Sequence, residues 1–288
     1  MKLTKYISSL SALLAINLLF FSAVTLAQTE VSVLVVYTDD ARVGAGSVGN
    51  IETQIISVVD DGNVALANSN VNMVVTIADM RELAVNEASY ASLTAITDAV
   101  ANPSDPTFDI VHDWRNEVAA DIVFLVFEGI AANGQAHEVC GSGFPCDASF
   151  ESEAFATGQR GLMLVAPVLF IHELGHVMGL RHDRTRDCGS PTVTCLMAAF
   201  PYSFGHIDPN TPTTWGTVMA GGRPFPLVDF FSTPTLTHPT TGQALGVANF
   251  SDAARSLNNV REIIAGFREG EAAQDLSWLV PVLHLLLN

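Results

Sequence analysis

Residues 172–183, which read His-Glu-Leu-Gly-His-Val-Met-Gly-Leu-Arg-His-Asp, constrain the fold of this chain more than any other stretch. His172 and His176 are four residues apart, and this spacing places both side chains on one face of an α-helix. Gly179 follows, and glycine readily adopts the left-handed conformation in which many helices end. A turn at this point can bring His182 back toward the helix. The sequence therefore predicts a helix, a sharp turn and three imidazoles that converge on one point.

Three converging imidazoles are typical of a metal site. The alternative is an amphipathic helix that carries two histidines by chance, but it leaves the positions of Gly179 and His182 unexplained. Structural zinc sites have four protein ligands, whereas catalytic sites have three and keep one position for water. We therefore expect His172, His176 and His182 to bind a catalytic Zn²⁺ ion.

Two carboxylates accompany the histidines. Glu173 follows His172 directly, so it lies near the metal without having to bind it. A carboxylate in that place can take a proton from water that attacks a substrate, and can pass it to the leaving group. We expect Glu173 to be catalytic and Asp183 to be structural. Asp183 either fixes the turn through hydrogen bonds or orients a ligand histidine.

The pattern H-E-x-x-H-x-x-G-x-x-H resembles the zinc helix of the metzincin metallopeptidases. Metzincins carry a methionine turn beneath the zinc, downstream of the third histidine, and Met219 in Thr217-Val-Met-Ala is similar to it. In several metzincin families a tyrosine two positions after that methionine binds zinc. Gly221 occupies that position here, so the resemblance implies no tyrosine ligand.

Other segments resemble the reprolysin-like metzincins of bacteria, and among these the peptidyl-Asp metalloendopeptidases. The segments are Leu34–Thr38, Ala120–Val123, Phe230–Pro234 and Ala253–Phe267. This group is associated with cleavage on the amino side of acidic residues. Arg223 lies just after Met219, where metzincins build the wall of the substrate pocket, and could pair with a substrate carboxylate. The alternative for Arg223 is an ordinary surface arginine.

Apolar segments alternate between strand-like and helical patterns, which predicts an α/β domain. We expect strands at Val31–Tyr37, Val71–Ile77, Asp121–Phe127 and Leu162–Val165, and helices at Val48–Asn68, Leu83–Val100, Phe108–Asn116, Pro167–Met178 and, capped by Ser251, Ala253–Phe267. The resemblance implies a mixed twisted sheet with helices above a cleft, and a smaller irregular or helical C-terminal part with the methionine turn. Substrate is expected to pair with an edge strand near Leu162–Val165.

The N-terminus has the pattern of an export signal. Lys2 and Lys5 precede an apolar run, and the small residues Thr25 and Ala27 suit cleavage after residue 27. An uncleaved membrane anchor is the alternative, but the apolar run is short for a span. We therefore expect a secreted protein.

The mature chain divides into three predicted parts. Residues 28–184 form the part with the zinc helix, and residues 185–270 form the part with Met219 and the final helix. Residues 271–288 form an apolar tail, which either packs on the domain or serves in sorting or anchoring. The tail is too short to span a bilayer.

The four cysteines are an even number, which favours disulfides in an exported chain. Local pairs, Cys140–Cys146 and Cys188–Cys195, are the simplest of three pairings, and all three remain open. A cysteine zinc site is the alternative, but the histidines already account for the metal.

A net charge of -17 argues against nucleic acid as a partner, because no basic patch is available to neutralise phosphates. We expect a monomeric zinc endopeptidase that acts on proteins or peptides, with no stable membrane span after the signal is removed. Two alternatives remain. One is a secreted, zinc-stabilised binding or adhesion module that captures peptides without cutting them, and the other is a zinc aminopeptidase.

Overall fold

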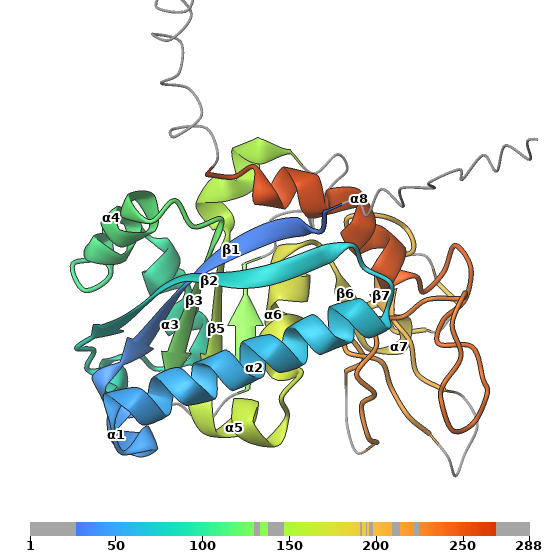
Figure 1. The fold of residues 1–288 in the computed structure, drawn as a ribbon, viewed down its shortest axis with the longest axis horizontal. Helices are drawn as coiled ribbons and strands as arrows, with labels where there is room; N and C mark the ends of the chain where they lie inside the picture. Colours follow the sequence, from blue (N-terminus) through green and yellow to red (C-terminus); the bar gives the residue numbers. More distant parts are fainter. Residues whose placement is uncertain are drawn as a thin grey trace, which may run out of the picture.

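The computed structural model describes residues 27–129, 133–137, 147–190, 192–193, 195, 198–208, 214–221 and 225–268. A five-stranded sheet of order β2-β1-β3-β5-β4 forms the centre (Figure 1). The strands are β1 (Thr29–Thr38), β2 (Met73–Leu83), β3 (Ile122–Phe127), β4 (Gly134–Ala136) and β5 (Phe155–Gln159). β4 pairs antiparallel with β5, and the other neighbours are parallel. The predicted α/β class with a mixed sheet is confirmed.

Helices surround this sheet, and a second, two-stranded sheet follows it. The helices are α1 (Asp39–Ala45), α2 (Val48–Asn68), α3 (Leu93–Ala101), α4 (Asp109–Glu117), α5 (Arg160–Val165), α6 (Leu169–Val177), α7 (Arg184–Cys188) and α8 (Ala253–Ala265), with 3-10 turns η1 (Glu87–Ser89) and η2 (Ala148–Glu153). The small sheet pairs β6 (Arg181–Asp183) with β7 (Phe204–Gly205). Within the described ranges, none of the helices is long and apolar enough to cross a membrane.

Both faces of the central sheet are covered. Val33 and Val35 of β1 pack into a cluster with α2, α6 and α8, whereas Leu34 and Val36 pack into a second cluster with α3 and α4. A strand buried on both faces needs apolar residues at every position. This explains why β1 and β3 are continuous apolar runs. Figure 1 shows α2 lying across one face of the sheet.

The predicted helix Val48–Asn68 has the same limits in α2. Ser47 caps it, because its side chain accepts a hydrogen bond from the Asn50 amide. The predicted apolar stripe is buried in full, and its residues are Ile51, Ile55, Val58, Val59 and Leu66. The cap at Ser47 and the burial of the apolar stripe therefore both stabilise this helix.

The helix predicted from Leu83 to Val100 is wrong in its first half. β2 continues to Leu83 and η1 follows, so the helix α3 begins only at Leu93. Ser92 marks that start, since its side chain accepts a hydrogen bond from the Ala95 amide.

The strand predicted at Leu162–Val165 is also wrong, because these residues lie in α5. The Gln159 side chain accepts a hydrogen bond from the Leu162 amide at 2.6 Å, which caps the helix. The strand lies earlier, at β5, and β4 covers its free side. The edge strand of the sheet at this end is therefore β4.

The final helix is confirmed, but its predicted cap is not. The amides of Ala253 and Ala254 donate to Oγ and O of Ser232, at 2.9 and 3.1 Å. Ser251 Oγ instead accepts a hydrogen bond from the Val247 amide.

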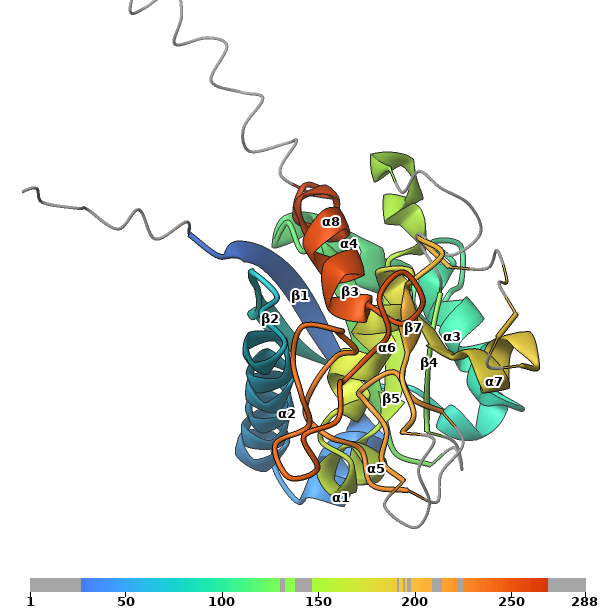
Figure 2. The same ribbon diagram turned by 90° about the vertical axis from the view of Figure 1, so that its right-hand side faces the viewer.

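The segments after β7, orange and red in Figures 1 and 2, lie together at one end of the molecule with β6 and α7. α8 extends from them along β1.

One predicted local disulfide, Cys188–Cys195, is present. Cys140 and Cys146 lie outside the described residues, as do the tail 271–288 and all of the predicted signal 1–27 except Ala27. The division after residue 184 stays a prediction.

Candidate active site

α6 carries His172, Glu173 and His176, and it ends at Val177. Gly179 then has a φ of 79°, in the left-handed region that favours glycine. The turn places the following residues in β6, where the Arg181 amide donates to Ser203 O at 2.9 Å. β6 therefore holds the third histidine against the helix that carries the other two.

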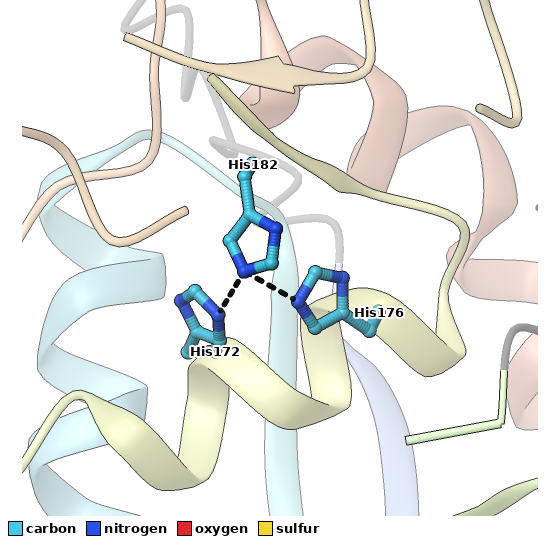
Figure 3. Close-up of side chains that lie close together, drawn as sticks. All are labelled: His172, His176 and His182. Carbon is cyan, nitrogen blue, oxygen red and sulfur yellow. Dashed lines mark hydrogen bonds between the residues drawn. The ribbon is translucent and has the colours of Figure 1, made fainter. Parts of the chain in front are cut away.

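The three imidazoles converge, as Figure 3 shows. His172 and His176 project from α6, and His182 points down toward them from β6. His182 Nε2 lies 3.3 Å from His172 Nε2 and 3.3 Å from His176 Nε2. The ligand atoms of all three lie within 4.8 Å of one another. The predicted cluster is therefore formed.

The opposite ring nitrogen of each histidine faces a hydrogen-bond acceptor. A neutral imidazole has one N–H, so an N–H at Nδ1 leaves Nε2 as an acceptor. Burial lowers the pKa of His176 to about 4, and the nearby His182 contributes to this shift. His176 is therefore neutral at neutral pH, and its protonation does not supply the cluster with positive charge. The acceptors are Val218 O for His172 (2.7 Å), Leu180 O for His176 (2.8 Å) and Asp187 Oδ1 for His182 (3.0 Å).

This donor set fits zinc. Zn–N bonds of about 2.0–2.1 Å at tetrahedral angles separate the ligand nitrogens by about 3.3–3.4 Å. Two of the Nε2 pairs are 3.3 Å apart. Nitrogen lone pairs that face one another at this distance repel, and a cation among them turns this repulsion into attraction. Three histidines, each held at its other nitrogen, match the usual surroundings of a metal site.

Asp187 in α7 is a site residue that the sequence analysis missed. Its Oδ1 lies 3.0 Å from His182 Nδ1, and its Oδ2 accepts the His182 amide at 2.9 Å. Burial acts to raise the pKa of Asp187, but hydrogen bonds and charge from His182 outweigh it, and the pKa is lowered overall. Asp187 therefore orients His182 as a carboxylate partner.

Asp183 instead holds the turn. Its Oδ1 accepts the Arg186 amide at 3.2 Å, and its Oδ2 accepts the Gly221 amide at 3.1 Å. These contacts match the first of the two roles considered for Asp183. They also tie β6 and α7 to the segment that contains Met219.

Replacement of Asp187 by asparagine should weaken zinc binding about 10- to 100-fold, the usual cost of losing the partner of a ligand histidine. Asparagine has the same shape but loses the negative charge that favours the N–H at His182 Nδ1. Competition with a chromophoric chelator measures the affinity. Asp98→Asn is the matched control, because Asp98 contacts His137 outside the cluster. An Asp187→Asn affinity within twofold of wild type would contradict the assigned role.

Glu173 is only 3% exposed, and burial raises its pKa to about 8. Its carboxylate lies against the edge strand, since a Cβ on Gly134 of β4 would be 2.7 Å from Glu173 Oε1. A bound cation beside the carboxylate would lower this pKa again. The carboxyl of Glu173 is therefore held between α6 and the edge strand β4.

Met219 packs against α6 at Gly175. It is fully buried, and a Cβ on Gly175 would lie 2.7 Å from its Sδ. The preceding residue, Val218, provides the carbonyl that faces His172 Nδ1. The segment around Met219 therefore supports both the helix and one imidazole.

A cleft of about 590 Å³ is lined by the three histidines. Its lining includes residues 133–136 of the edge strand region and the apolar residues Leu162, Val165 and Leu169 of α5 and α6. Beyond the histidines it is lined by Arg181 and Arg186. Arg223, the candidate substrate residue from the sequence, lies outside the described residues.

An α/β domain with this histidine cluster, a buried glutamate and a cleft along a sheet edge defines a histidine-liganded metallopeptidase. The chain belongs to Metallo-peptidase family M12, because the reprolysin-type profile of that family matches residues 27–224. The family resemblance inferred from the sequence is confirmed.

Curated relatives carry the name peptidyl-Asp metalloendopeptidase. The chain is 29% identical over 245 residues to that of Stenotrophomonas maltophilia (strain K279a), covering 83% of this chain and 52% of the relative. It is 28% identical over 240 residues to that of Xanthomonas campestris pv. campestris, covering 83% and 52%. The Pseudomonas aeruginosa relative is 28% identical over 261 residues, covering 86% and 42%. The chain thus spans about half the length of these relatives.

A solved structure described as a chaperone-substrate complex also matches. Its TM-score is 0.64 at 18% identity, and the match covers 85% of this chain and 36% of that chain. At this identity the likeness supports the fold alone.

Proposed function

We propose that this protein is a zinc-dependent endopeptidase in which His172, His176 and His182 hold the metal. The observation that carries the proposal is the convergence of three Nε2 atoms, with two separations of 3.3 Å, beside the buried carboxyl of Glu173. Membership of the metallopeptidase family supports the same assignment.

Zinc held by the three histidines would supply Lewis-acid chemistry, which makes water more acidic and polarises a carbonyl. Glu173 takes a proton from the attacking water and delivers it to the leaving nitrogen. Asp187 and the two carbonyl acceptors keep the imidazoles oriented while this happens.

We propose a metzincin-like arrangement for the fold, with Met219 in the methionine turn below the zinc. The contact of Met219 Sδ with Gly175 supports this, as does the hydrogen bond between Val218 O and His172 Nδ1. Gly221 stands at the position of the tyrosine that ligates zinc in some metzincins. In this chain that position lies against Arg186.

Endopeptidase action is favoured by the shape of the cleft. Among the described residues β4 is the last strand of its sheet at this end, so its outer edge can pair with an extended peptide. The cleft is lined by residues of α5 and α7 as well as by the histidines. We expect it to accept a peptide on both sides of the metal, which an aminopeptidase does not require.

The substrate preference follows from the names of the relatives. We propose cleavage on the amino side of acidic residues, for which the names of the relatives support aspartate, and Arg223 stays a sequence-based candidate for the pocket. Export through the signal at residues 1–27 and action as a secreted monomer are also proposals, and they rest on the sequence pattern.

Cleavage of casein and of a mixed peptide library, followed by mass spectrometry of the products, tests this function. Internal cuts that a chelator abolishes are expected. Stepwise loss of N-terminal residues would instead indicate an aminopeptidase. A zinc-loaded protein that binds peptides and cuts none would indicate a binding module.

A further inference from the structure

Arg186 lies in α7, four residues after His182, and lines the cleft. We infer that its guanidinium binds the substrate carboxylate beside the scissile bond. The inference rests on the proposed peptidase function, which it deepens by naming the residue that selects an acidic substrate.

The position of Arg186 is set by Gly221. A Cβ built on Gly221 would lie 2.1 Å from Arg186 Cδ and 3.1 Å from His182 Cδ2. The apolar stem of Arg186 therefore crosses the backbone of Gly221 directly beside a metal-site imidazole. A side chain at position 221 would displace that stem. The same Cβ would lie 2.8 Å from Arg186 Nε, so the guanidinium begins beside the His182 imidazole.

The positive charge of Arg186 has no partner among the described residues. The side chain is exposed, and within the described part of the chain its guanidinium has no ion pair or hydrogen bond. Both neighbouring carboxylates are engaged, because Asp187 holds His182 and Asp183 accepts two backbone amides. By contrast, Arg160 pairs with Glu128 through two nitrogens, at 2.6 and 2.8 Å.

The chemistry of this end of the cleft suits a carboxylate. A guanidinium presents parallel N–H groups that match the two oxygens of a carboxylate. The chain carries a net charge of -17, so an acidic substrate needs a local cation to overcome repulsion. Around α5 the cleft is apolar instead, and Val165 there is 76% exposed. An acidic side chain therefore has its best partner on the α7 side.

Arg181 lines the same cleft but differs in its surroundings. It is half-buried, and burial lowers its pKa although Asp187 acts in the opposite direction. Arg181 is half-buried and lies near Asp187, which already holds His182. It is therefore less able than the exposed Arg186 to bind a substrate carboxylate. Arg181 therefore provides a matched comparison within the cleft.

Two peptides that differ only by Asp or Asn after the scissile bond test the inference through the ratio of their kcat/KM values. Arg186→Gln should lower this ratio about 10- to 100-fold, in line with the loss of a hydrogen bond between charged groups. Arg186→Met keeps the apolar stem over Gly221 and should lower it equally. The ratio should stay near wild type in Arg181→Gln and in Arg42→Gln, whose arginine pairs with Glu82 on the surface.

A ratio within twofold of wild type in both Arg186 variants would overturn the inference. So would a collapse of the ratio in Arg181→Gln or Arg223→Gln alone, or a wild-type enzyme that cuts both peptides equally well. A wild-type protein that is loaded with zinc and cuts neither peptide nor casein would contradict the proposed function itself.

Discussion

Replacement of Glu173 by glutamine should lower kcat about 10²- to 10⁴-fold, the usual contribution of a positioned general base. Glutamine has the shape of the protonated side chain, and burial raises the pKa of Glu173 to about 8, so the neutral amide suits this environment. Zinc content should stay at the wild-type level, because the three histidines are unchanged. A quenched fluorescent peptide measures kcat, and elemental analysis measures zinc.

Glu262→Gln is the matched control for this loss, because the Glu262 side chain is 70% exposed and lies on α8. It should retain wild-type kcat. The role given to Glu173 would be contradicted if its glutamine variant bound zinc normally and kept kcat near wild type. It would also be contradicted if kcat fell only because zinc was lost.

Replacement of His182 by alanine should remove bound zinc and peptide hydrolysis together. His182 is the ring whose Nε2 lies 3.3 Å from both other Nε2 atoms, so its loss opens the cluster. We expect zinc affinity to fall more than about 100-fold, beyond the cost of losing only an orienting partner. Zinc at 100 times its dissociation constant stabilises a protein by about 2.7 kcal/mol, so the thermal shift on adding zinc should also disappear.

His137→Ala is the control for the metal, because His137 contacts Asp98 and Glu153 outside the cluster. It should bind one zinc per chain and show the wild-type thermal shift. A His182→Ala protein that keeps stoichiometric zinc, or a His137→Ala protein that loses it, would place the metal elsewhere.

The histidine cluster could be predicted because its geometry is local. His172 and His176 lie four residues apart on one helix, and Gly179 turns the chain within a few residues of His182. The surrounding sheet was predictable for a related reason. β1 and β3 are buried on both faces, so their sequences are apolar at every position.

Asp187 was missed because its role depends on a short helix that the sequence analysis did not identify. Two signals mark α7, since Asp183 caps its start and Gly189, with φ 72°, ends it. With that helix in place, Asp187 is brought back beside His182. A search for carboxylates up to five residues after the last ligand would have included it.

The errors at Leu162–Val165 and at Ser251 have different causes, one local and one tertiary. A short apolar run suits a helix or a strand equally well by periodicity, and the Gln159 side chain decides for a helix at Leu162. The N-terminus of α8 is capped by Ser232, which lies 21 residues before Ala253 in the chain. Partners that are distant in sequence cannot be read from local spacing.

Removal and return of zinc in one sample tests the central claim most directly. The purified chain is treated with a chelator, dialysed, assayed on a peptide with an internal aspartate, and then given one equivalent of zinc. Circular dichroism follows the fold throughout. The apo protein should be folded and inactive, and zinc should restore the internal cut. Cleavage by a protein shown to lack metal, or a folded zinc-loaded protein that makes no internal cut, would contradict the claim.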